Sequence, residues 1–186
     1  MIGFALCGSF CTVGKSLLEL EKLTARYSVQ GIVSETVYRT DTRFQSAAHV
    51  IEKMRALTGR DVIHDIVGAE PLGPQMPLEA LIICPCTGNT LAKMANGITD
   101  TAVTMAAKAH LRSNRPLVIA LASNDALSAN LKNIGAMLTR KNVYFVPMTQ
   151  DDPEKKPHSL VADFSMLQKT LEAALQGKQY QRIFTV

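Results

Sequence analysis

Residues 8–15 (GSFCTVGK) place small and hydroxyl-bearing side chains between an apolar run and an amphipathic one. Glycine permits a tight turn, and serine or threonine hydroxyls can bind a phosphate together with the backbone N–H groups at a helix start. The spacing is not that of a P-loop, because five residues rather than four separate Gly8 from Gly14. It is not G-x-G-x-x-G either. The residues alone predict either an anion site or an ordinary strand-to-helix turn.

Residues 85–100 (PCTGNTLAKMANGITD) follow the strongly apolar segment 78–84. Small and amide-bearing residues here, such as Gly88 and Asn89, can approach a flat ligand closely and hydrogen-bond its polar edge. Asn89 could equally cap a helix, and Asn96 with Gly97 could form a plain helix C-terminus. Local rules leave both interpretations open.

Other polar side chains could add contacts to an anionic ligand. Ser34 follows the apolar residues 29–33, and its hydroxyl could reach a phosphate. The hydroxyls and carboxylate at 40–42 favour helix capping in the same region. A dicarboxylate would favour forked cationic partners. The candidates are Arg112, Arg115, Lys132 and Arg140.

The cysteines and histidines do not group into a metal site. Cysteines at 7, 11, 84 and 86 lack the Cys-x-x-Cys spacing of structural zinc. They could form redox pairs if two strand ends lie side by side, but small buried thiols are favoured. His64 and Asp65 make a poor acid–base pair, because neighbours on a strand point to opposite faces. The residues predict no metal and leave the catalytic residues unassigned.

Apolar segments alternate with amphipathic ones along the chain, which is typical of an α/β protein. We expect strands at 2–7, 29–33, 78–84, 117–121 and 143–146, and a short one at 62–63. We expect helices at 14–26, 47–57, 87–108 (divided near Asn96), 126–140 and 161–175. Loops are expected at 68–77, which holds Pro71, Pro74 and Pro77, and at 151–159.

This alternation predicts a mostly parallel sheet covered by helices on both faces, in three layers. Open sheets of this kind bind ligands at the carboxyl ends of their strands. Residues 1–186 are expected to form a single domain, completed by a loop and a C-terminal helix within 151–186.

The composition narrows the function classes. The 186 residues are 47% hydrophobic and 19% charged, typical of a soluble globular protein, and a net charge of +4 would suit an anionic ligand. The cations are scattered and tryptophan is absent, so nucleic-acid binding by base stacking is not expected. The uncharged stretch 1–14 is shorter than the ~20 residues of a membrane helix, and no basic segment precedes it. A cytoplasmic protein with reduced thiols is therefore expected.

The segment 85–100 resembles the PATANTIAKIANGIADNL motif of the homo-oligomeric flavin-containing cysteine decarboxylases, a family of FMN-binding flavoproteins. The matching positions are Pro85, Thr87, Asn89, Thr90, Ala92, Lys93, Ala95, Asn96, Gly97, Ile98 and Asp100. Residues 8–15 resemble the family's first loop, GSIAAYK, with a longer insertion before Lys15. The resemblance spans about residues 2–147. It implies a Rossmann-like fold that binds FMN near a subunit interface, commonly in trimers.

The resemblance implies an FMN site made by residues that follow the predicted strands. Gly8 and Ser9 would hold the phosphate, and Ser34 would face the phosphate and the ribityl chain. Pro85, Thr87 and Asn89 would line the flavin, and Asn96 would lie nearby at the subunit interface. Ser123 and Asn124 would add further ligand contacts.

Two departures from the family pattern bear on the reaction. By spacing, Pro71 stands in place of the decarboxylases' catalytic histidine, and residues 122–125 (ASND) replace a Pro-x-Met-Asn substrate segment. An FMN-dependent cysteine-type decarboxylase is therefore the weaker alternative. Nearly the whole chain resembles instead a branch of the family that works with a separate A subunit. The segments that carry this resemblance are 1–15, 82–112, 124–138 and 143–159. That branch forms dipicolinate, a pyridine dicarboxylate, from a dihydrodipicolinate-type precursor during sporulation.

This branch implies an oxidation of a ring, with a flavin able to accept the hydride. NADPH is then expected on the partner subunit rather than on this chain, and a homo-oligomer, a trimer or a multiple of it, is expected. A non-catalytic regulatory or binding subunit with a vestigial flavin site is the other alternative. It is motivated by Cys86 and Gly88, which replace family alanines, and by Pro71.

Overall fold

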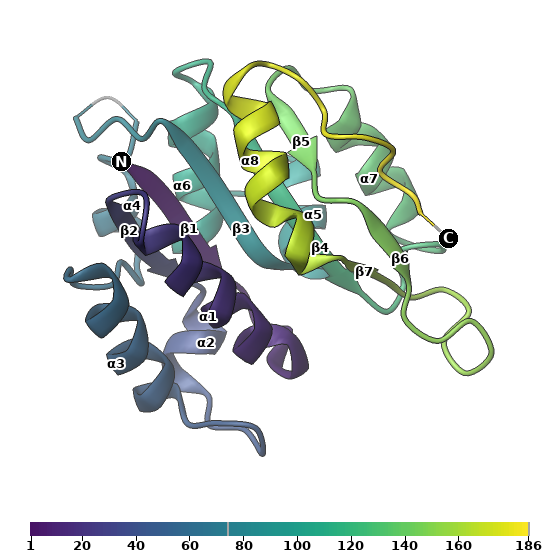
Figure 1. Cartoon of the computed structure of the whole chain (residues 1–186), viewed down its shortest axis with the longest axis horizontal. Coiled ribbons are helices and arrows are strands. Elements are labelled where there is room, and N and C mark those ends of the chain that lie inside the picture. The colour runs from purple at the N-terminus through teal and green to yellow at the C-terminus, as the bar shows by residue number, and fades with distance from the viewer. Residues whose placement is uncertain (74, 186) are drawn as a thin grey trace.

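A computed structural model describes residues 1–73 and 75–185 (Figure 1). Pro74 of the predicted 68–77 loop and Val186, the last residue of the predicted domain, lie outside the described residues. Within them the strands form one seven-stranded sheet in the order β2-β1-β3-β4-β7-β6, with β5 also paired to β4. The strands are β1 (Ile2–Leu6), β2 (Val29–Val33), β3 (Ala80–Thr87), β4 (Leu117–Ser123), β5 (Val143–Phe145), β6 (Met148–Gln150) and β7 (Leu160–Ala162).

Strands β1 to β5 pair in parallel, and every residue of β1, β2, β4 and β5 is buried. Burial on both faces explains why these segments read as continuous apolar runs. Near its start β4 pairs with β5, from Leu117 to Ile119, whereas near its end it pairs antiparallel with β7 through Ala122 and Ser123. The predicted mostly parallel sheet is confirmed.

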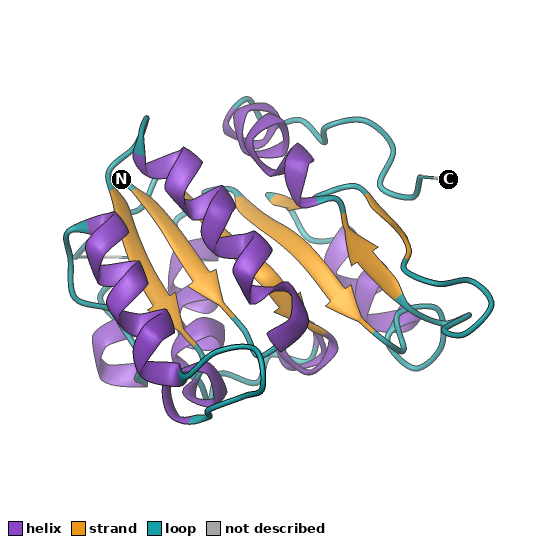
Figure 2. Cartoon of the chain, turned by 60° about the horizontal axis from the view of Figure 1, so that its bottom comes forward, coloured by secondary structure: helices purple, strands orange, loops and turns teal. Residues whose placement is uncertain are grey.

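Helices cover both faces of this sheet (Figures 1 and 2). One core cluster packs the sheet against α1, α3 and α8, through residues such as Leu17, Met54 and Leu171. The other packs it against α5, α6 and α7, through residues such as Leu91 and Val103. The helices are α1 (Phe10–Thr24), α2 (Glu35–Arg39), α3 (Ala47–Thr58), α4 (Ile66–Ala69), α5 (Gly88–Ala95), α6 (Ala102–Leu111), α7 (Leu131–Leu138) and α8 (Leu167–Leu175).

Several predicted boundaries are wrong for identifiable reasons. Helix α1 begins at Phe10 rather than at 14, and the loop expected after β2 contains α2, which Ser34 caps. Residues 126–130 are a turn instead of helix, because the backbone N–H groups of Ser128 and Asn130 bond to the carbonyl of Asp125.

The C-terminal part of the chain also differs from the prediction. Val161 lies in β7 rather than in the helix predicted at 161–175, where it pairs with β4 and β6. A 3-10 turn (Phe164–Met166) follows, and α8 begins only at Leu167. The short strands β6 and β7 carry too few residues for a recognisable period-2 pattern.

The strand order sets where a ligand can bind. From β1 the chain first moves to β2 on one side and then returns to β3 on the other side. The loops after β1 and β3 therefore diverge and leave a crevice between them at the carboxyl edge. In open α/β sheets with this 2-1-3-4-5 order, ligands bind at that switch point. None of the helices in the described part of the chain is long and apolar enough to cross a membrane.

Candidate functional site

An open cleft of about 840 Å³ lies at the carboxyl ends of β1, β3 and β4. Its size falls in the range usual for small-molecule sites, roughly 300–1,000 Å³. The cleft brings together residues from loops far apart in the sequence, as expected at a switch point. Six of the nine predicted site residues line it: Gly8, Ser9, Thr87, Asn89, Ser123 and Asn124.

The start of α1 forms one wall of the cleft. Ser9 is the N-cap residue of α1, but its side chain makes no capping hydrogen bond, and the first turn carries no acidic residue. The Thr12 hydroxyl donates to the carbonyl of Ser9 at 2.8 Å and contacts its hydroxyl oxygen at 3.0 Å. Because the Ser9 side chain does not cap α1, it leaves the first backbone N–H groups of this helix to other acceptors. This helix start therefore offers backbone and side-chain donors to an anion.

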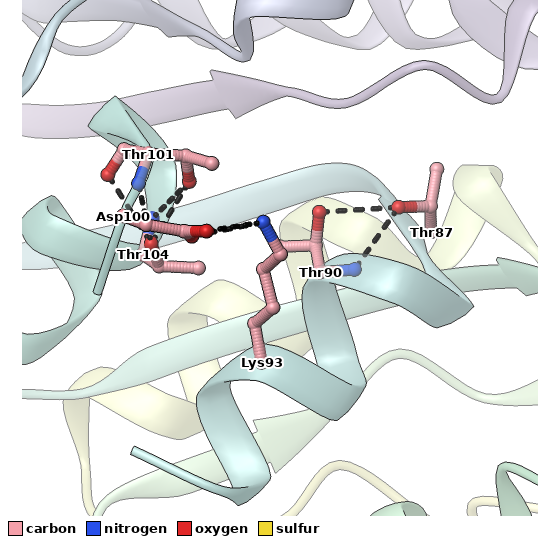
Figure 3. Close-up of polar contacts among 6 residues, drawn as sticks. All are labelled: Thr87, Thr90, Lys93, Asp100, Thr101 and Thr104. Atoms are coloured by element: carbon pink, nitrogen blue, oxygen red, sulfur yellow. Dashed lines mark hydrogen bonds and ion pairs between the residues drawn. The ribbon is translucent and has the colours of Figure 1, made fainter. Parts of the chain in front are cut away.

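The start of α5 forms the facing wall and is packed differently. The Thr87 hydroxyl accepts a hydrogen bond from the backbone N–H of Thr90 at 3.2 Å and so caps the helix (Figure 3). A Cβ atom on Gly88 would lie 2.3 Å from the Ser123 hydroxyl and 2.6 Å from the Asn130 amide nitrogen. Only glycine therefore lets the loop after β4 approach α5 this closely.

Asp125 is held against the start of α5 by that loop. Its carboxylate accepts a hydrogen bond from the Ser123 hydroxyl at 2.6 Å and two from the Asn130 amide at 2.9 Å. Asn133 in turn donates to Asn130 at 2.8 Å. The bonds from Ser123 and then Asn130 hold the pKa of Asp125 below its usual value. The protein's own carboxylate thus sits at the α5 terminus, whereas the α1 terminus is left for a ligand.

The other three predicted residues do not line the cleft. The Ser34 hydroxyl, predicted to face the phosphate, instead caps α2 by accepting from the Val37 N–H at 3.4 Å. Pro85 is buried within β3. Asn96 ends α5 on the exposed surface, where its side chain donates to the Ala92 carbonyl at 2.8 Å. As this chain stands alone, these three residues have structural roles.

Residues at the mouth of the cleft were not among the predicted site residues. Arg43 and Phe44 come from the loop after α2, and the Arg43 guanidinium lies 4.9 Å from the Phe44 ring centre. Lys156 and Asp151 come from the loop between β6 and β7, where they form an ion pair. The sequence gives no signal for these contacts, because more than a hundred positions separate the two loops.

The profile of the Flavoprotein family matches residues 1–168. The chain belongs to the Flavoprotein family. It is 45% identical over 183 residues to the B subunit of dipicolinate synthase from Bacillus subtilis (strain 168), covering 98% of this chain and 92% of that protein. The crystal structure of the B subunit of dipicolinate synthase from Bacillus halodurans C superposes with a TM-score of 0.91 at 42% identity. The match covers 100% of this chain and 95% of the chain in that structure.

More distant members share the fold alone. The FMN-dependent cysteine decarboxylase SpaF superposes over 94% of both chains with a TM-score of 0.70 at 21% identity. The resemblance stated from residues 85–100, and the Rossmann-like fold that it implies, are confirmed.

In this flavoprotein the loop after α5 is fixed by a short ion pair. The Lys93 ammonium donates to both Asp100 carboxylate oxygens at 2.8 and 2.9 Å (Figure 3). This contact keeps the pKa of Asp100 below its usual value. A capping box between Thr101 and Thr104 then starts α6. The motif positions Lys93 and Asp100 therefore shape the turn between two helices and lie outside the cleft.

The Asp125 network predicts an acid-sensitive stability. Because the pKa of Asp125 is lowered on folding, its contribution is present above the unfolded pKa of about 3.9. That contribution is lost as the pH falls through the lower folded pKa. In thermal melts between pH 6 and 3 we expect Asp125→Asn to lose less stability on acidification than the wild type does. Parallel curves for the two proteins would contradict this expectation.

The cysteines are placed as small buried groups with one exception. Cys7, Cys84 and Cys86 are buried and Cys11 is exposed, and the described residues form no disulfide. Burial raises the pKa of Cys7 to about 11 and raises those of Cys84 and Cys86 as well. A buried, protonated thiol is unreactive, since the thiolate is the nucleophile.

We therefore expect one thiol per native chain to react quickly with a maleimide at pH 7.5, and Cys11→Ser to abolish that reaction. Since Cys11 lines the cleft, a ligand bound there should slow its labelling. Mass spectrometry after a short pulse measures both effects. Rapid labelling of a second cysteine in the folded wild type would contradict this assignment.

Proposed function

We propose that this chain binds FMN in the cleft and acts as the B-type subunit of a two-subunit enzyme that forms dipicolinate. The 45% identity to the B subunit of a dipicolinate synthase over nearly the full length supports the choice of reaction. The cleft at the β1/β3 switch point, with an uncapped helix start on one wall, is the observation that supports the cofactor.

The residues present fit a flavin mononucleotide. Its phosphate would bind at the start of α1, where Gly8, the Ser9 hydroxyl and the first backbone N–H groups offer donors and the first turn carries no acidic residue. The two carboxylates that line the cleft have partners of their own: Asp125 accepts from Ser123 and Asn130, and Asp151 pairs with Lys156. Asn89 and Asn124 are exposed amides that could hydrogen-bond the polar edge of the ring. Thr87 lines the same wall. When bound, FMN would supply the ability to accept a hydride from a ring being oxidised.

The lining of the cleft bears on the decarboxylase alternative. None of the four histidines, all within the described residues, lines the cleft. A decarboxylase relying on a histidine of this chain is thus disfavoured. Pro71, which stands in place of the decarboxylases' histidine by spacing, does not line the cleft either. We propose that a different A subunit completes the site and binds NADPH, and that the chain itself assembles into trimers or multiples of them in the cytoplasm during sporulation.

Two measurements test this proposal in sequence. Titration of the purified chain with FMN, followed by flavin fluorescence, should show saturable binding. A Kd weaker than about 1 mM, or about −4 kcal/mol, would overturn the cofactor assignment. Next, the A subunit should form dipicolinate from the precursor only when the FMN-loaded chain is added.

Equal rates with and without this chain would favour the non-catalytic alternative. The informative variant is Asn89→Ala, which removes an exposed amide in the cleft and should lower the rate while the two subunits still co-purify. Release of carbon dioxide from a cysteine-ended substrate by this chain alone would favour the decarboxylase alternative.

A further inference from the structure

A second pocket of about 340 Å³ is lined by α6, by the turn between α5 and α6, and by Arg140, which follows the end of α7. It shares no lining residue with the FMN cleft. Figure 1 shows α5, α6 and α7 together behind the sheet, on the face opposite α1 and α8. Its apolar floor is made by Met94, Ile98, Ala107 and Leu111. This pocket is thus separate from the site described above.

Three cations line this pocket, and no acidic residue does. Lys108 and Arg112 lie four residues apart along α6, which places them on one face of the helix, and Arg140 reaches over from the end of α7. Like charges at this spacing repel each other. Among the described residues none of the three forms an ion pair with a carboxylate. The pocket therefore holds positive charge that the chain itself does not balance.

One of the three cations is anchored in place. The Arg140 guanidinium donates to the carbonyl of Ala95, at the end of α5, at 3.0 Å. This bond uses one of the five guanidinium N–H donors and holds the group beside the pocket. The remaining N–H groups can donate to a carboxylate. Arg112 adds a second guanidinium to the lining of the same pocket. A lining that combines two guanidinium groups with apolar side chains suits a ligand that carries two carboxylates on one flat ring.

We propose that this pocket binds a small planar aromatic dianion of the pyridine-dicarboxylate class. The choice of a pyridine ring rests on the proposed function, whereas the preference for a flat dianion rests on the pocket alone. By contrast, two of the four cations first considered for such a ligand do not contribute. Arg115 is turned to the carbonyl of Leu78 at 2.7 Å, and Lys132 does not line the pocket.

The test uses the full chain loaded with FMN, so that the cleft is filled. Calorimetric titration with pyridine-2,6-dicarboxylate should give one site per chain. Pyridine-2-carboxylate, with one carboxylate, should bind at least tenfold more weakly, as should inorganic phosphate at matched ionic strength. Benzene-1,3-dicarboxylate carries the same two carboxylates on a ring without the nitrogen. We expect it to bind within about threefold of the pyridine compound, because the charges and the flat ring are kept.

The variants are Lys108→Gln, Arg112→Gln and Arg140→Gln, with Lys132→Gln on α7 as the matched control. Each of the three should weaken the dianion at least fivefold with FMN affinity unchanged, and the control should bind like the wild type. Lys108 and Arg112 are exposed, so these two variants should fold even if Arg140→Gln does not.

Wild-type affinity in all three variants, or displacement of the dianion by FMN, would overturn the proposal. So would a loss of binding that accompanies a change in sedimentation, because the cations would then serve a contact between copies of the chain. Failure of FMN to bind in its own titration would instead overturn the proposed cofactor, and the dianion titration of the unloaded chain would still decide this pocket.

Discussion

Replacing Ser9 by aspartate should weaken FMN binding at least about 100-fold, or roughly 2.7 kcal/mol, without lowering the thermal stability. Ser9 is the N-cap of α1, but its hydroxyl does not cap the helix. An aspartate is a preferred N-cap residue and interacts well with the helix dipole, so the fold should be kept or slightly stabilised. The same carboxylate would face the FMN phosphate, and two like charges about 4 Å apart repel by roughly 4 kcal/mol at an effective dielectric constant near 20.

The opposite signs of the two effects make this variant informative. A fluorescence titration measures the affinity, and a thermal melt measures the stability of the unliganded protein. The matched control is Thr101→Asp, which adds the same charge at the N-cap of α6, outside the cleft, where Thr101 already caps the helix. The control should bind FMN like the wild type. Equal FMN affinities for Ser9→Asp and the wild type would contradict the proposal that the FMN phosphate binds at the start of α1.

Replacing Gly88 by alanine should destabilise the protein by about 1–3 kcal/mol and weaken FMN binding about tenfold. The new Cβ would overlap the Ser123 hydroxyl and the Asn130 amide, and both side chains are buried. Moving them would break their hydrogen bonds to Asp125 and leave polar groups without partners. The loop carrying Asn124 would shift with them, which is why the affinity should fall as well.

Gly14→Ala is the matched control for that substitution. Gly14 lies within α1 on the exposed surface, and a Cβ there would meet no atom within 4 Å. Alanine is favoured over glycine in a helix by up to about 1 kcal/mol, so this variant should be more stable than the wild type. Urea unfolding of both proteins gives the comparison. If Gly88→Ala were as stable as Gly14→Ala, the close packing of α5 against the loop after β4 would be contradicted.

The sequence predicts the parallel sheet and much of the cleft because both depend on local patterns. Buried strands read as apolar runs, and the residues after them, such as Ser9 and Asn89, must lie at one edge once the strands are parallel. The motif at 85–100 identifies the family, and the family match confirms it. Local chemistry predicts helix capping by residues 40–42. Asp41 does accept the Ala47 N–H at the start of α3, but the N-cap residues of α2 and α3 are Ser34 and Ser46.

What the sequence does not predict depends on contacts between distant segments. Val161 begins the segment in which a helix is predicted, and its pairing with Ala122 of β4 and Thr149 of β6 makes it a strand residue instead. Gly88 differs from the family's alanine by one methyl group, and the reason is visible only when Ser123, Asp125 and Asn130 are brought beside it. Arg112 and Arg140 likewise line one pocket because α6 and α7 both pack against α5.

The division of β4 between two partners has a consequence for how a ligand enters and leaves. The end of β4 is held to β7 by two residue pairs, whereas its beginning belongs to the buried parallel sheet. The hairpin of β6 and β7, with the exposed loop that carries Lys156, is joined to β4 by fewer residue pairs than the parallel strands share, so we expect it to open before they do. Amide protons of this hairpin would exchange with solvent sooner than those of β1 and β3. The residence time of a ligand beneath the loop would then follow a local opening and stay independent of the global folding equilibrium.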